Sequence, residues 1–317
     1  MHFMRVSTSL WGRSAVSDVV YLSPSRLATY ADCARKYDHK YEQRVETPDE
    51  TTLYLNQGLA YHETIEVVCN ETEPDDEPEQ IHARAMATFE ETWADHIDPA
   101  DYASHSHQEF QRAENRAALD TFFDPNGGDG IEHARSSVET ERWVKFERNG
   151  RGLHGKVDNI LKTEDEIHLI DYKRNLRDVI SSGTATRLED HRNGDDHEPK
   201  RVKNAFQTAT YIEGIKQSPL YEDGMTVRFS FYGLMNQGSF VSRPDGYEVS
   251  ARGYPRETTG IYDEYNDMIW SLIEEAHDGI TSDVYDPKPF DLINDEACPD
   301  CDYSDACPEY IAERVSR

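Results

Sequence analysis

The sequence runs Gly155-Lys156-Val157-Asp158 and, shortly afterwards, Ile170-Asp171-Tyr172-Lys173. Each quartet lies in a segment with strand character, Leu153–Lys162 and Glu166–Lys173, and the polar residues between them mark a turn. If the two strands pair symmetrically about that turn, the residue numbers of antiparallel partners add up to 329. The two quartets therefore predict a β-hairpin that brings their charged residues together.

This pairing places Asp158 directly opposite Asp171, with Cβ atoms about 4.5–5.5 Å apart, and Lys173 on the same face. Like charges opposite one another destabilise a sheet unless something neutralises them. A divalent cation would do so. Two carboxylates suit Mg²⁺ or Mn²⁺, and a neighbouring lysine can position or activate a water molecule. The alternative is an exposed strand face with ordinary charges, which are common in a chain this acidic.

Hydrophobic periodicity outside the hairpin predicts a helical first half and a strand-rich second half. Ser23-Pro24 begins the first helix, Pro125–Gly130 ends the helical half, and Asn149-Gly150 predicts a tight turn. The predicted helices are Ser25–Tyr41, Gln57–Cys69, Gln80–His96, His107–Phe123, Asn204–Gln217 and Thr259–Asp278. The other predicted segments are the strand Val138–Phe146, a hairpin of Thr226–Leu234 with Ser239–Arg243, and a mobile loop at Leu188–Lys200.

These elements predict an α/β fold with a central mixed β-sheet flanked by helices. We expect an N-terminal extension over residues 1–22 and a helical part over 23–136. A core over 137–290 and a cysteine-bound C-terminal staple over 291–317 complete the expected organisation.

The chain of 317 residues has a formal net charge of −29 and only 10 lysines. Such an acidic, lysine-poor surface is typical of a protein from a halophile. It would ordinarily argue against a nucleic-acid partner, but in molar salt the Debye length shrinks to about 3 Å, so DNA is not excluded. No apolar stretch approaches the roughly 20 residues that a membrane span needs, and we expect a cytoplasmic protein without a membrane partner.

The cysteines are clustered in a way that favours a metal over disulfides in a reducing compartment. Cys298, Cys301 and Cys307 form a compact set of three thiolates, which needs a fourth ligand. Cys33 and Cys69 stand far from them in the sequence.

Four motifs, in this order, resemble those of the PD-(D/E)XK nuclease superfamily in its RecB-like branch, which includes CRISPR-associated exonucleases and AddB-type repair nucleases. They are Gly58–His62 (Gly-x3-His), Gly155–Asp158, Asp171–Lys173 ((D/E)-x-K) and Gln207–Tyr211 (Gln-x3-Tyr). The resemblance implies a restriction-endonuclease-like fold and extends from Ser23 to Pro308.

The resemblance also assigns roles to single residues. His62, Asp158 and Asp171 would hold Mg²⁺ or Mn²⁺, Lys173 would assist the attacking water, and Gln207 with Tyr211 would position the strand. Taken alone, His62 could equally be a packing residue on an amphipathic helix, Gln207 a surface amide and Tyr211 a core aromatic.

Cys33 lies in a segment that resembles the first-cysteine motif of iron–sulfur members of this branch. The resemblance implies that Cys33, Cys298, Cys301 and Cys307 bind a [4Fe–4S] cluster, with zinc as the alternative. Cys69 is expected to be a buried free thiol. Closing so long a loop would remove chain entropy from the unfolded state worth about 5 kcal/mol.

The function that follows from the resemblance is metal-dependent hydrolysis of DNA, expected to be exonucleolytic, at single-stranded or unwound ends during repair or recombination. The alternatives are a CRISPR spacer-acquisition exonuclease and a non-catalytic DNA-binding subunit of a repair complex. The sequence has no P-loop motif, so any helicase would be a separate protein. Lys200-Arg201-Val202-Lys203 could meet phosphates near the site or could equally be a solvated helix start.

Overall fold

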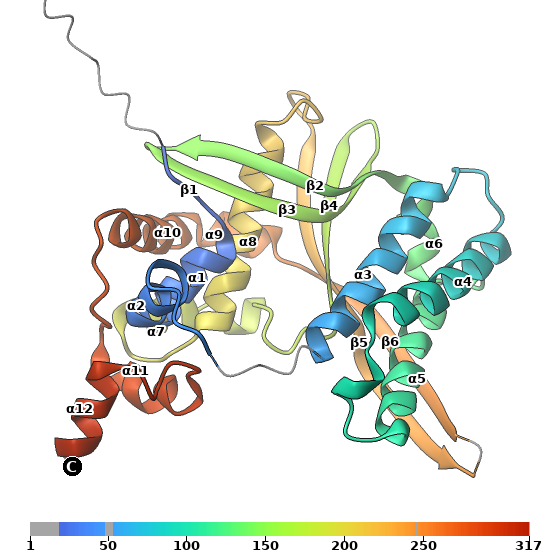
Figure 1. The fold of residues 1–317 in the computed structure, drawn as a ribbon. Helices are drawn as coiled ribbons and strands as arrows, with labels where there is room; N and C mark the ends of the chain where they lie inside the picture. The colour runs from blue at the N-terminus through green and yellow to red at the C-terminus, as the bar shows by residue number, and fades with distance from the viewer. Residues whose placement is uncertain (1–18, 48–52, 245, 317) are drawn as a thin grey trace, which may run out of the picture.

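The computed structural model describes residues 19–47, 53–244 and 246–316, and within them the fold is α/β with a mixed sheet flanked by helices (Figure 1). This confirms the predicted fold class. The helices are α1 (Pro24–Asp32), α2 (Ala34–Tyr37), a π-helix (Asp38–Glu42), α3 (Leu53–Glu71), α4 (Pro78–His96), α5 (His105–Phe122), α6 (Asp129–Ser136), α7 (Arg187–Asn193), α8 (Pro199–Lys216), α9 (Thr259–Glu264), α10 (Asn266–Thr281), α11 (Phe290–Glu296) and α12 (Pro308–Ser316). Short 3₁₀ turns cover Pro99–Asp101, Ser182–Thr184 and Cys298–Asp300.

The sheet contains β1 (Tyr21–Leu22), β2 (Ser137–Arg148), β3 (Arg151–Lys162), β4 (Glu166–Lys173), β5 (Thr226–Arg243) and β6 (Gly246–Glu257). Its order is β1-β3-β4-β5-β6, and β2 pairs with β3. β4 and β5 are parallel, so the chain must cross over between them, and α7 and α8 lie in that crossover. The crossover is what brings α8 against the sheet.

Two hydrophobic cores lie on opposite faces of the sheet, because neighbouring residues of β4 belong to different cores. Leu169 packs with α1, α8 and α10, whereas Ile170 packs with α3, α4, α5 and α6. In Figure 1 these two groups of helices stand on either side of the strands. A third, small core contains Cys33, Ile293 and Cys298 and joins the N-terminal helices to the tail.

The predicted hairpin of β3 and β4 has the expected register. The partners run from Lys162 and Ile167 to Asn159 and Ile170, and each pair of residue numbers adds up to 329. Pairing stops there, one residue before Asp158 and Asp171. The two aspartates therefore lie at the point where the strands separate.

Two predictions in the N-terminal half of the chain are wrong in detail. The helix expected over Ser25–Tyr41 is interrupted at Cys33, whose extended backbone (φ −162°, ψ 120°) ends α1. Pro125–Gly130 does not end the helical half, because α6 follows. The close packing of Gly128 and Gly130 against Phe122 allows that helix to form.

The segment Leu188–Lys200, predicted as a mobile loop, contains most of α7 and the first two residues of α8. Leu188 is fully buried, and Gly194 ends α7 in the left-handed conformation (φ 76°). Pro199 begins α8 at the first helical position, which suits its fixed φ.

The predicted hairpin of Thr226–Leu234 with Ser239–Arg243 is instead a single strand, β5, which pairs with β6. The register shifts between Gly233 and Gln237, and the side chain of Asn236 bonds the carbonyl of Gly233 within this bulge. The helix predicted at Thr259–Asp278 is divided at Tyr265 into α9 and α10. Of the expected extension over residues 1–22, residues 1–18 lie outside the described part, while Tyr21 and Leu22 form β1 and pair with β3.

Candidate functional site

The two aspartates lie at the open end of the β3–β4 hairpin. Where the ladder stops, the Asp158 carboxylate accepts the backbone N–H of Tyr172 at 2.7 Å. Asp171 is buried, with 3% of its surface exposed, and its charge is close enough to affect the ionisation of Asp158. Burial, followed by the charge of Asp171, raises the pKa of Asp158 well above its usual range.

Lys173 follows on the same strand and faces Asp171. Its Nζ atom lies 2.7 Å from Oδ2 of Asp171 and 3.4 Å from Oε1 of Gln207. An ammonium group in this position offsets part of the carboxylate charge.

Gln207 and Tyr211 belong to α8, which the β4–β5 crossover holds against the sheet. The Gln207 amide donates to Oδ1 of Asp171 at 3.0 Å and to the Tyr211 hydroxyl at 3.4 Å. Both side chains are buried. Gly155 explains how α8 comes so near, because a Cβ there would meet the Tyr211 ring at 2.5 Å. Gln207 therefore touches the site directly, and Tyr211 supports Gln207.

His62 reaches the site from α3 on the other side. Its Nδ1 atom lies 3.4 Å from Oδ2 of Asp158, and its ring stacks on Tyr61 at a centroid distance of 4.7 Å. Burial lowers the pKa of His62, which favours the neutral imidazole that binds metals.

Glu141 of β2 is a site residue that the sequence analysis missed. One ligand atom each from Glu141, His62 and Asp158 lie within 4.8 Å of one another. Glu141 has φ of +50° within a strand, a strained conformation for a residue with a side chain, and it forms an ion pair with Lys156. The Asn149-Gly150 turn could have located Glu141 in the sequence. In the β2–β3 hairpin that follows from this turn, Thr140 pairs with Asn159 and Arg142 with Val157, which puts Glu141 level with Asp158.

The donors at this site fit a hard divalent cation. They are carboxylate oxygens with one imidazole, which suits Mg²⁺ or Mn²⁺. Oδ2 of Asp171 is buried and accepts no well-formed hydrogen bond, although Lys173 lies beside it. The raised pKa of Asp158 also fits, since a bound cation would favour its ionised form. A cavity of about 400 Å³, lined by His62, Glu141 and Lys156 among others, opens beside these groups.

The four cysteines of the predicted cluster come together at the opposite end of the molecule from α4 and α5. Cys33 and Cys298 share the small third core. Burial, followed by the charges of Cys33, Cys307 and Cys301, raises the pKa of Cys298 to about 12, so all four thiols are electrostatic neighbours. Arg35 ties α2 to the tail through an ion pair with Glu309 at 2.7 Å.

Cys69 lies apart from this group, as predicted. It is a buried free thiol on α3 that accepts a hydrogen bond from the Asn159 amide at 3.4 Å.

With this geometry established, comparison with known proteins identifies the family. The family model of the PD-(D/E)XK nuclease superfamily matches residues 21–308. The chain belongs to the PD-(D/E)XK nuclease superfamily. This membership supports a nuclease and confirms the superfamily, though not the RecB-like branch, that the four motifs indicated.

Other comparisons add little. The chain is similar to the crystal structure of a "Putative exonuclease" from Eubacterium rectale, with 12% identity, a TM-score of 0.44 and coverage of 84% of this chain and 83% of that chain. No curated protein matches the sequence. Among the helices that the structure describes, none has the length and apolar character needed to cross a bilayer.

Proposed function

We propose that this member of the PD-(D/E)XK superfamily is a metal-dependent deoxyribonuclease that hydrolyses phosphodiester bonds. The observation that carries the proposal is the meeting of Asp158, Asp171 and Lys173 at the open end of one hairpin, with His62 facing Asp158 from α3. An intact set of this kind argues against a role as a catalytically silent subunit.

Each residue has a distinct role in the proposed reaction. Asp158, Asp171 and His62 hold the metal, and Glu141 is placed to contribute a further oxygen. The bound Mg²⁺ or Mn²⁺ would lower the pKa of a water molecule and stabilise negative charge on the phosphate. Lys173 positions the attacking water and stabilises the developing charge.

Gln207 orients the centre from α8. Its amide N–H donates a hydrogen bond to one oxygen of Asp171, and its amide oxygen accepts one from Lys173. Gln207 therefore holds the Asp171 carboxylate and the Lys173 ammonium group in place relative to each other. Tyr211 is a positioning residue, because it contacts Gln207 and packs against Gly155. We therefore assign the orientation of the substrate strand mainly to Gln207, with Tyr211 holding Gln207 in position.

The substrate we propose is DNA with single-stranded or unwound ends, degraded as an exonuclease of the RecB-like branch in repair or recombination. A separate helicase would supply the unwound strand. This part of the proposal rests on the order and spacing of the four motifs rather than on a contact in the structure.

We also propose that Cys33, Cys298, Cys301 and Cys307 bind a [4Fe–4S] cluster. Zinc is the alternative, because four thiolates would satisfy it equally well. The cluster would tie α1 and α2 to the tail.

The test is digestion of end-labelled DNA by the purified protein, with Mg²⁺, with Mn²⁺ and with EDTA. We expect products with either metal and none with EDTA or with the isosteric variant Asp171→Asn. Cleavage that survives in Asp171→Asn would contradict the assignment of the site. RNA cleaved in preference to DNA would contradict the substrate.

A further inference from the structure

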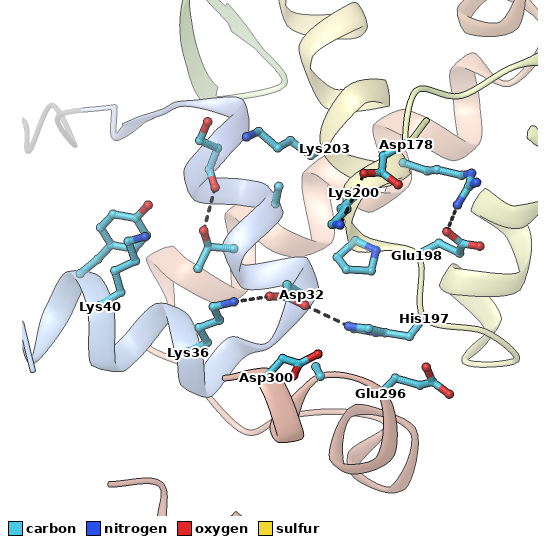
Figure 2. Close-up of a pocket in the computed structure, with 17 residues that line it drawn as sticks. Asp32, Lys36, Lys40, Asp178, His197, Glu198, Lys200, Lys203, Glu296 and Asp300 are labelled. Atoms are coloured by element: carbon cyan, nitrogen blue, oxygen red, sulfur yellow. Dashed lines mark hydrogen bonds and ion pairs between the residues drawn. The ribbon is translucent and has the colours of Figure 1, made fainter. Parts of the chain in front are cut away.

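A second cavity, of about 540 Å³, lies where α1, α2, the beginning of α8 and the cysteine-rich tail meet. Figure 2 shows Lys36 and Lys40 on the wall formed by the N-terminal helices, Lys200 and Lys203 on α8, and Asp300 on the tail. We call it the lysine cavity. It shares no lining residue with the cavity beside His62.

The lysine cavity concentrates positive charge in a strongly acidic chain. Four of the 10 lysines of the whole sequence line it, together with Arg201. These cations balance the five carboxylates of the lining, although the chain as a whole carries a net charge of −29. The carboxylates are Asp32, Asp178, Glu198, Glu296 and Asp300.

Some of these cations already have partners. Lys36 forms an ion pair with Asp32 at 2.9 Å, and Lys200 forms one with Asp178 at 3.4 Å. Arg201 is paired with Glu198 at the start of α8.

Lys40 and Lys203 differ from these residues. Both are exposed, and neither forms an ion pair with a carboxylate of the described residues. The cavity therefore presents two cations without a carboxylate partner to an anion.

Lys203 connects the lysine cavity with the catalytic centre. It lies one helical turn before Gln207, whose amide bonds Asp171. Partial desolvation of the otherwise exposed Lys203 side chain and then the charge of Lys173 lower the pKa of Lys203, so Lys173 lies near enough to act on it. An anion bound at Lys203 would lie next to the site where the scissile phosphate must sit.

We propose that the lysine cavity binds backbone phosphates of the single nucleic-acid strand undergoing cleavage, with Lys40 and Lys203 as the principal contacts. The inference rests on the proposed nuclease function and specifies where the strand lies beyond the scissile bond. A strand fits better than a lone anion because the two cations stand on different walls and the second leads to the catalytic centre. Contacts between backbone phosphates and cationic side chains are a usual basis of sequence-independent binding to single strands.

The test compares the double variant Lys40→Gln/Lys203→Gln with Lys216→Gln/Lys288→Gln, which changes the net charge equally. Neither Lys216 nor Lys288 lines the cavity. Binding of a fluorescein-labelled single-stranded oligonucleotide is followed by anisotropy in EDTA, over a series of KCl concentrations. Loss of two phosphate contacts should weaken binding about tenfold or more and reduce the slope of log K against log [KCl] by about 1.4. The control should match the wild type.

Several outcomes would overturn the inference. One is equal binding by the two double variants when circular dichroism shows both folded. Another is thermal stabilisation by inorganic phosphate that the cavity variant loses while strand binding stays intact, which would assign the cavity to a small anion. The proposed function is judged separately, since a wild-type protein that cleaves no DNA with Mg²⁺ or Mn²⁺ would contradict that function whatever the cavity binds.

Discussion

At the scale of single residues, the proposed chemistry depends on a lysine and an aspartate that differ in burial. Asp171 is almost completely buried, whereas Lys173 is partly exposed. This difference in burial cannot be read from the sequence, because alternation along a strand assigns each side chain to a face of the sheet but does not say how deeply it is buried. A variant that tests Asp171 should therefore be isosteric, so that a loss of activity is not caused by a change in packing.

Asp171→Asn and Lys173→Ala should each reduce cleavage by two or more orders of magnitude, because one removes a metal ligand and the other the group beside the water. The measurement is the single-turnover rate on labelled DNA, with circular dichroism as a check of folding. Glu164→Ala is the matched control, since this exposed residue of the β3–β4 turn lies far from the site. A comparable loss in the control variant would argue against the assignment.

Asp158 gives a prediction about stability without metal. Its pKa is raised in the folded protein, so its contribution to stability is present below the pKa of an unfolded aspartate and is lost as pH rises through the raised value. Asp158→Asn should therefore raise the melting temperature of metal-free protein by a few degrees at neutral pH, while cleavage is lost.

Calorimetry with and without Mg²⁺ checks this prediction. Mg²⁺ should stabilise the wild-type protein and have little effect on Asp158→Asn, because a ligand stabilises only the state that binds it. Near pH 3 the two metal-free proteins should differ much less. A variant less stable than the wild type at neutral pH would show that the hydrogen bond to Tyr172 outweighs the cost of the buried charge.

At the scale of elements, the sequence specified the hairpin register well and the surroundings of the site less well. The β3–β4 register follows from local turn geometry and side-chain alternation, both of which are readable in the sequence. The position of Glu141 could have been found by extending the register of the Asn149-Gly150 turn to Asp158, whereas its backbone φ of +50° could not be read from the residue type. The break at Cys33 was missed because apolar residues keep helical spacing on both sides of it.

The same break gives Cys33 its position facing the tail, which leads to a prediction for the cysteines. Protein purified without oxygen should be brown and contain about four irons per chain. Serine at Cys33, Cys298, Cys301 or Cys307 should each remove the visible absorption and lower the melting temperature, because each supplies one ligand.

Cys69→Ser is the control for that series. Cys69 lies on α3 and accepts a hydrogen bond from Asn159, which a serine hydroxyl can also accept, so its colour and stability should be retained. Colourless wild-type protein with one zinc per chain would refute the iron–sulfur cluster while leaving the four-cysteine staple. Loss of colour from Cys69→Ser would show that the wrong four residues were chosen.

At the scale of the whole molecule, the net charge of −29 sets the conditions in which the site can work. At low ionic strength the chain repels itself and also the phosphates of its substrate, because the Debye length is about 30 Å at 0.01 M salt. The lysine cavity is a local exception to this field, with its cations in balance with its carboxylates. Salt weakens both the long-range repulsion and the short-range attraction, and these two changes should therefore act on substrate binding in opposite directions.

Both effects together predict a rise and then a fall of cleavage as KCl increases. Screening should first relieve repulsion, so the melting temperature and the cleavage rate rise over part of the range toward molar KCl. Release of the phosphate contacts should then weaken binding. Initial rates on labelled DNA measured across KCl concentrations, with choline chloride in parallel, would reveal the optimum and separate screening from binding of a particular ion. Rates that fall steadily from the lowest salt would contradict the halophile interpretation, because repulsion would then have no measurable part in the reaction.

An optimum that moves to higher KCl in Lys216→Gln, which makes the chain more acidic without touching the site, would identify overall charge as its cause.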